Sequence, residues 1–176
     1  MEKGSVYFFT GLAGAGKTTI GRAFYKRLKE TRPNALLFDG DQTRADSGHK
    51  DYSTEARRKG AQGMFEKCRE LGLQGIDSVY CGIAMYEDIR AWNRENIENY
   101  KEIYIKVSME TLYKRNQKGL YSPGAQQVVG VDLPWDEPQS PDAVIENDNE
   151  ECPELIAERL IRQFVAGRTE GGSHGG

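Results

Sequence analysis

Several features that would indicate other classes of protein are missing from this sequence. No apolar run is long enough to cross a bilayer, and no segment repeats. The 176 residues carry a formal net charge of -3, and the pI is about 5.5. This acidic balance argues against broad binding to nucleic acid or to a membrane surface. We therefore expect any anion site to be a local cluster.

Cysteine and histidine are also scarce. The three cysteines are Cys68, Cys81 and Cys152, none forms a Cys-x-x-Cys pair, and the two histidines are His49 and His174. This set does not match the ligand spacing of a zinc site. Cys68 and Cys81 lie in apolar patterns, which predicts core packing. An odd cysteine count without a leader segment favours a reducing cytoplasm.

The segment of residues 6–19 dominates what is present. Within it, Gly11-x-x-x-x-Gly16-Lys17-Thr18 fits the P-loop pattern, with an apolar run before it and a helical pattern after it. Glycines let the backbone take positive φ and approach a ligand, so that loop amides can surround a phosphate at a helix N-terminus. The predicted nucleotide site comprises Gly11, Leu12, Ala13, Gly14, Ala15, Gly16, Lys17, Thr18 and Thr19.

Two side chains of the loop have separate expected tasks. Lys17 would reach the β- and γ-phosphates of ATP, and the Thr18 hydroxyl would bind Mg²⁺. A glycine-rich turn without a phosphate is the plainer alternative, but the strand before the loop and the helix after it favour nucleotide binding.

Hydrophobic periodicity predicts alternating strands and helices along the whole chain. This alternation indicates right-handed βαβ units and an α/β fold, a three-layer P-loop kinase domain with a five-stranded, mostly parallel sheet. We expect one domain at residues 1–167, with a long mobile loop at 115–141 and a flexible glycine-rich tail at 168–176. The predicted strands are residues 6–10, 35–38, 77–83, 103–107 and 143–146, and the helices follow Gly16, Ser53, Ile83, Ser108 and Cys152.

The class of P-loop protein follows from what accompanies the loop. A GTPase would carry Asn-Lys-x-Asp and Asp-x-x-Gly motifs, which are absent, and a motor or transporter ATPase would usually be longer. Asp39 and Asp41 directly follow the second predicted strand. Carboxylates at the carboxyl edge of a parallel sheet face the ligand crevice, which suits a small-molecule kinase.

Further motifs resemble those of the adenylyl-sulfate (APS) kinases, in that family's order and across roughly residues 4–165. The P-loop alone is generic, but its combination with Asp39-Gly-Asp-x-x-Arg44 and Lys118-Gly-Leu-Tyr121 is specific. The matching segments are Phe9-Thr-Gly-Leu-Ala-Gly-Ala-Gly-Lys-Thr-Thr-Ile20, Asp39-Gly-Asp-x-x-Arg44, Tyr52-Ser-x-Glu-x-Arg57, Lys118-Gly-Leu-Tyr121 and Val129-Gly-Val-Asp-x-Pro-Trp-Asp-Glu-Pro138.

The resemblance implies transfer of the γ-phosphoryl of ATP, with Mg²⁺, to the ribose 3'-hydroxyl of adenylyl sulfate. By matching position, Asp41 would orient or deprotonate that hydroxyl, and Asp39 would hold magnesium or support the loop. Arg115 and Lys118 would be catalytic cations over the transferred phosphoryl. The remaining acceptor residues implied are Arg44, Tyr52, Arg57, Ile83, Gly119 and Leu120. The family is often dimeric, so a homodimer is one option.

The same residues have plainer interpretations. Asp39 or Asp41 could cap a turn, and Lys118 could be an ordinary loop lysine. Arg57 belongs to a basic run that could be a solvated helix face, and Tyr52 could pack in the core.

Departures from the family gather at the acceptor side. The family's Phe-Ile-Ser-Pro is Gly82-Ile83-Ala84-Met85 here, and Gln42, Gly60 and Gln62 replace Asn, Asn and Arg. Gln127-Val128-Val129-Gly130 lacks the phenylalanine that faces adenine in the family. Adenylyl sulfate remains the default acceptor. The alternative is cytidine diphosphoramidate, which a related branch phosphorylates for capsule O-methyl phosphoramidate synthesis. A non-catalytic nucleotide-binding protein is a third interpretation.

Overall fold

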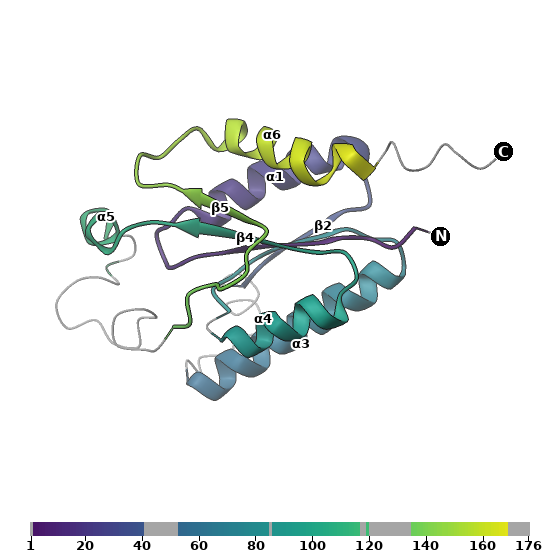
Figure 1. The fold of residues 1–176 in the computed structure, drawn as a ribbon, viewed down its shortest axis with the longest axis horizontal. Coiled ribbons are helices and arrows are strands. Elements are labelled where there is room, and N and C mark those ends of the chain that lie inside the picture. The colour runs from purple at the N-terminus through teal and green to yellow at the C-terminus, as the bar shows by residue number, and fades with distance from the viewer. Residues whose placement is uncertain (1, 41–52, 85, 117–118, 120–134, 169–176) are drawn as a thin grey trace.

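The protein folds around a five-stranded parallel sheet, seen in a computed structural model that describes residues 2–40, 53–84, 86–116, 119 and 135–168. The strand order is β2-β3-β1-β4-β5, and each neighbouring pair is parallel (Figure 1). The strands are β1 (Val6–Thr10), β2 (Leu36–Asp39), β3 (Ser78–Cys81), β4 (Tyr100–Lys106) and β5 (Ala143–Glu146).

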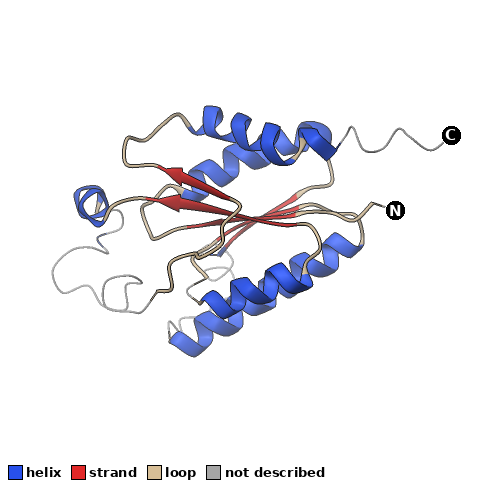
Figure 2. Cartoon of the chain, viewed as in Figure 1, coloured by secondary structure: helices blue, strands red, loops and turns tan. Residues whose placement is uncertain are grey.

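Helices cover both faces of the sheet and complete three layers (Figure 2). On one face lie α1 (Lys17–Thr31) and α6 (Pro153–Phe164), and on the other lie α3 (Thr54–Leu73) and α4 (Glu87–Asn96). The short α5 (Met109–Arg115) follows β4, and a 3-10 helix, η2 (Ala166–Arg168), follows α6. In the described part of the chain, no helix is both long and apolar enough to span a membrane.

The central position of β1 in the sheet explains why its first four residues, Val6–Phe9, are all apolar or aromatic. Val6 and Phe8 pack with Phe65 beneath α3, while Tyr7 and Phe9 pack with α1 in the other core layer. A central parallel strand is buried on both faces, so alternation of apolar and polar residues disappears. The strand that leads into the P-loop is therefore held rigidly between two cores.

Serine caps fix two helix starts that the sequence predicts. The Ser53 hydroxyl accepts from the backbone N–H of Ala56 at 3.2 Å at the start of α3, and Ser108 accepts from Thr111 at 3.3 Å at the start of α5. Such caps satisfy backbone donors that have no partner in the first helical turn.

Three details differ from expectation. Strand β3 covers only Ser78–Cys81 rather than residues 77–83, and β4 covers Tyr100–Lys106 rather than residues 103–107. Helix α5 extends through Arg115, so the predicted loop begins one residue later.

Candidate active site

The P-loop joins β1 to α1 at the carboxyl edge of the sheet. Gly14 and Gly16 have φ of 84° and 103°, which side chains rarely allow. A Cβ on Gly11 would lie 2.6 Å from the carbonyl oxygen of Ile105, and one on Gly16 would lie 2.7 Å from Asn147 Nδ2. The glycines are therefore required both by backbone conformation and by close neighbours.

Lys17 brings a positive charge to this cradle. It is the first residue of α1, and only 7% of it is exposed. A buried ammonium beside backbone amides at the N-terminus of a 15-residue helix suits a polyphosphate. Thr18 follows on the same turn and is half-buried. The cradle thus fits the triphosphate and magnesium site predicted for it.

A second layer of residues supports the loop from behind. Asn147, directly after β5, is buried and donates from Nδ2 to the Ala15 carbonyl at 2.9 Å. Arg115, at the end of α5, donates to the Gly14 carbonyl at 3.0 Å and to the Asn147 carbonyl at 2.5 Å. Its Nε lies 3.2 Å from a Glu150 carboxylate oxygen. In this conformation Arg115 braces the P-loop, and its predicted role over the transferred phosphoryl stays a prediction.

Asp39 ends β2, two strands away from the P-loop strand. It pairs in register with Cys81 of β3, and Cys81 pairs with Phe9 of β1. Burial, and after it the Asp39 carboxylate, raise the pKa of the Cys81 thiol to about 12, although the Lys17 ammonium acts to lower it. Asp39 and Lys17 therefore both lie near Cys81, at the carboxyl edge of the sheet.

Magnesium would have few protein ligands here. Within the described ranges, no group of three or more His, Cys, Asp and Glu side chains could hold a metal ion. Mg²⁺ in kinases is usually held by one or two protein oxygens together with substrate phosphates. Thr18 and Asp39 remain the predicted pair.

The segment after β3 borders the same edge. Thr10, the last residue of β1, donates from its hydroxyl to the Ile83 carbonyl at 2.6 Å. Ile83 is half-buried and packs against the core.

The remaining predicted acceptor residues that the structure describes are Arg57 and Gly119. Arg57 lies in the first turn of α3 and is half-buried, whereas Arg58 and Lys59 are exposed. Gly119 is exposed with φ of 67°, and its N–H donates to the Asn116 carbonyl at 3.1 Å.

Other predicted site residues lie outside the described residues: Asp41, Arg44, Tyr52, Lys118 and Leu120. Their roles stay predictions.

Comparisons with known proteins bear on this arrangement. Residues 3–146 match the adenylylsulphate kinase family. A cytidine diphosphoramidate kinase of Campylobacter jejuni is 39% identical over 163 residues, covering 88% of this chain and 95% of that protein. A probable adenylyl-sulfate kinase of Archaeoglobus fulgidus is 32% identical over 148 residues, covering 81% and 96%.

The chain belongs to the adenylylsulphate kinase family. It is therefore a phosphotransferase, as the motifs predict. A solved APS kinase of Mycobacterium tuberculosis, in complex with AMPPNP and APS, has the same fold: the TM-score is 0.80 at 22% identity, over 92% of this chain and 98% of that one. The resemblance seen in the sequence and the predicted P-loop kinase fold are both confirmed.

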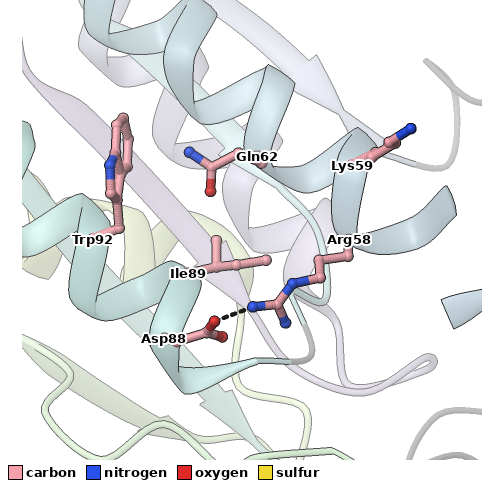
Figure 3. Close-up of a pocket in the computed structure, with 6 residues that line it drawn as sticks. All are labelled: Arg58, Lys59, Gln62, Asp88, Ile89 and Trp92. Atoms are coloured by element: carbon pink, nitrogen blue, oxygen red, sulfur yellow. Dashed lines mark hydrogen bonds and ion pairs between the residues drawn. The ribbon is translucent and has the colours of Figure 1, made fainter. Parts of the chain in front are cut away.

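Two departures from the family pattern, Gly60 and Gln62, lie on α3, and their surroundings differ. A Cβ at Gly60 would meet no atom within 4 Å among the residues that the structure describes. Gln62 lines an open groove of about 330 Å³ between α3 and α4, with Arg58, Lys59, Asp88, Ile89 and Trp92 (Figure 3). Arg58 pairs with Asp88 at one end of this groove. No P-loop residue lines it, so the groove is separate from the nucleotide cradle.

Sequence reasoning missed Asn147, Thr10 and Arg90. Asn147 follows a predicted strand, and polar residues at strand ends are a signal that could have revealed it. The sequence pattern places Thr10 in a strand and does not show that its hydroxyl holds the segment after β3. For Arg90 the sequence carries no signal, because a charged residue in an amphipathic helix normally predicts a solvated face.

Proposed function

We propose that this kinase transfers the γ-phosphoryl group of ATP to the ribose 3'-hydroxyl of a nucleotide acceptor. The observation that carries the proposal is the glycine cradle with buried Lys17, at the same carboxyl edge of the sheet at which β2 ends in Asp39. Phosphoryl transfer depends mainly on positioning and on neutralising charge, which this arrangement can supply.

Each residue would have one task. The loop amides and Lys17 would hold the triphosphate, and Asp41 would accept the proton of the attacking hydroxyl. Mg²⁺ held by Thr18 and Asp39, when bound, would neutralise charge on the β- and γ-phosphates. Arg44 and Arg57 would hold the acceptor's phosphate, while Arg115 and Lys118 would add positive charge near the transferred group.

We infer that cytidine diphosphoramidate is the acceptor. Its support is the 39% identity to the Campylobacter jejuni enzyme along nearly all of that protein. The departures from the adenylyl-sulfate pattern point the same way. Losing the aromatic wall would weaken adenine stacking by about 1–3 kcal/mol. A pyrimidine needs less of that wall, and this chain would then serve capsule biosynthesis.

Adenylyl sulfate is the second candidate. The family match and the 32% identity to the Archaeoglobus fulgidus protein favour it, and the product would be 3'-phosphoadenylyl sulfate for sulfate assimilation.

An acceptor screen separates these candidates. ADP release should be measured with ATP and Mg²⁺ against cytidine diphosphoramidate, adenylyl sulfate, CDP and AMP. We expect kcat/KM for cytidine diphosphoramidate to exceed that for adenylyl sulfate by at least about tenfold, since one stacking contact is worth that much. A preference for adenylyl sulfate would instead favour the second candidate. ATP binding without turnover on any acceptor would favour a non-catalytic role.

A further inference from the structure

Arg90 is a charged side chain with no exposed surface. It lies in the first turn of α4, and its guanidinium donates to the Glu87 carboxylate at 2.9 Å. It also donates to the Ala84 carbonyl at 2.6 Å and to the Asp136 carbonyl. The Trp135 ring centroid lies 5.8 Å from its central carbon. One side chain therefore joins α4 to two separate backbone segments.

The first segment belongs to the acceptor side. Ala84 has a left-handed φ of 43°, an unfavourable conformation for alanine. Its carbonyl is held by Arg90, and the preceding carbonyl, that of Ile83, is held by Thr10 at the root of the P-loop. Two side-chain donors from different elements thus fix the backbone of residues 83–84.

The second segment is the stretch at residues 135–137. Asp136 receives Arg90 on its carbonyl, and its carboxylate accepts from the Glu87 N–H at 3.1 Å. Trp135 packs against Tyr104, whose hydroxyl donates to Glu137 at 3.1 Å. Arg90 and the N-terminus of α4 therefore hold this stretch against the sheet and close to Ala84.

Burying this guanidinium carries a desolvation cost, so a gain in stability alone does not explain the arrangement. A buried ion pair commonly contributes less than well-packed apolar residues of similar size would. Only arginine offers a planar fork of five donors that can serve a carboxylate and two carbonyls at once. The geometry thus favours a role in fixing backbone position over one in simple packing.

We propose that Arg90 is a positioning residue that holds residues 83–84 against residues 135–136 and so sets the acceptor-side wall. The proposal rests on the proposed function, because it assigns Ile83 to the acceptor. Acceptor binding should then depend on Arg90, whereas ATP binding at the P-loop should not.

Three variants test it: Arg90→Gln, Arg90→Lys and the control Arg94→Gln. Arg94 lies one turn later in α4 and pairs with the same Glu87, but it has no described contact with Ala84 or Asp136. Arg90→Gln loses hydrogen bonds made by a charged group, so we expect the acceptor KM to rise roughly 10–100-fold. The KM for ATP should change less than about threefold. Arg90→Lys should restore part of the loss, and Arg94→Gln should leave acceptor KM unchanged. Equal effects of Arg90→Gln and Arg94→Gln on both KM values would overturn the proposal.

Tryptophan fluorescence gives a readout that does not need turnover. The chain has two tryptophans, so Trp92→Phe leaves Trp135 as the reporter. In that background Arg90→Gln should shift Trp135 emission to longer wavelength, and Arg94→Gln should not. If the wild type phosphorylates no acceptor, the proposed function fails. The fluorescence would still test whether Arg90 holds residues 135–136 in place. Unchanged Trp135 emission in a folded Arg90→Gln protein would refute the positioning role.

Discussion

Lys17 is the buried cation of the P-loop, and its replacement tests the cradle at the scale of one residue. Lys17→Met keeps the length of the side chain but removes the charge near the γ-phosphate. We expect kcat to fall by roughly 10²–10³-fold, as for other preorganised transition-state contacts. Lys26→Met is a matched control on the exposed face of the same helix. Steady-state assays with a saturating acceptor measure both, and equal activities would contradict the role of Lys17.

Gly21 tests close packing between α1 and the sheet. A Cβ at this position would lie 2.3 Å from the Cys81 sulfur and 3.5 Å from the Phe9 ring. Gly21→Ala should therefore lower the free energy of unfolding by about 1–3 kcal/mol. Gly63→Ala, in the middle of α3 with no described atom within 4 Å of the new Cβ, should not lower it. Urea titration measures both variants.

A double variant identifies the atom responsible. Adding Cys81→Ala to Gly21→Ala removes the sulfur that the new methyl group would meet, so part of the lost stability should return. If the two losses simply add, the contact with Cys81 is not the cause.

At the scale of elements, Asp148 connects the end of β5 to the start of α5. Its carboxylate accepts from the hydroxyls of Thr111 and Ser108, both at 2.7 Å, and from the Ser108 N–H at 3.1 Å. These hydrogen bonds, the one from Thr111 foremost, lower the pKa of Asp148 from 3.8 to about 2. The folded state therefore prefers the ionised form.

The sign of the pH effect follows from that lowered pKa. Asp148 should stabilise the fold fully above pH 3.8, and this contribution should be lost as the pH falls toward 2. Asp148→Asn should flatten the dependence of the urea midpoint on pH between about 2 and 4. An identical pH profile in the variant and the wild type would show that the hydrogen-bonded carboxylate does not contribute.

Arg115 links α5, the P-loop and the segment after β5. Removing its guanidinium leaves the Gly14 and Asn147 carbonyls without this donor, so the loop should be less well held. We expect Arg115→Ala to raise the KM for ATP by about tenfold, the value of a hydrogen bond or two from a charged group. Lys114→Ala is the control, because this exposed lysine pairs with Glu110 at 3.0 Å within α5. A fall in kcat with an unchanged ATP KM would instead favour the predicted role over the transferred phosphoryl.

Local patterns predicted the elements well where they carry their own signals. The apolar run of β1, the Ser53 and Ser108 caps, and Pro153 at the start of α6 each specify a boundary locally. Patterns could not show that Arg90 is buried, because its partners at Ala84 and Asp136 depend on tertiary structure. The end of β3 was predicted two residues too late, because the apolar pattern runs on to Ile83 whereas the pairing of β3 with its neighbours stops at Cys81.

At the scale of the whole molecule, the parallel sheet gathers the site at one edge. β1 ends at the P-loop, β2 ends at Asp39, β5 ends next to Asn147, and the segment after β3 carries Ile83. The sequence predicted this gathering, since parallel strands in βαβ units place their carboxyl ends together. It did not predict the strand order or the contacts of Arg115 and Arg90, which require the three-dimensional arrangement.

The most direct measurement is the position of the phosphate on the product. The enzyme should be incubated with Mg²⁺, cytidine diphosphoramidate and ATP carrying an isotopic label in the γ-phosphate, and the product analysed by ³¹P–¹H correlated NMR. We predict that the phosphorus of the labelled phosphate couples to the ribose H3' proton. Lys17→Met should form this product at no more than about 1% of the wild-type rate. A labelled phosphate on any other acceptor atom, or release of inorganic phosphate alone, would contradict transfer to the ribose 3'-hydroxyl.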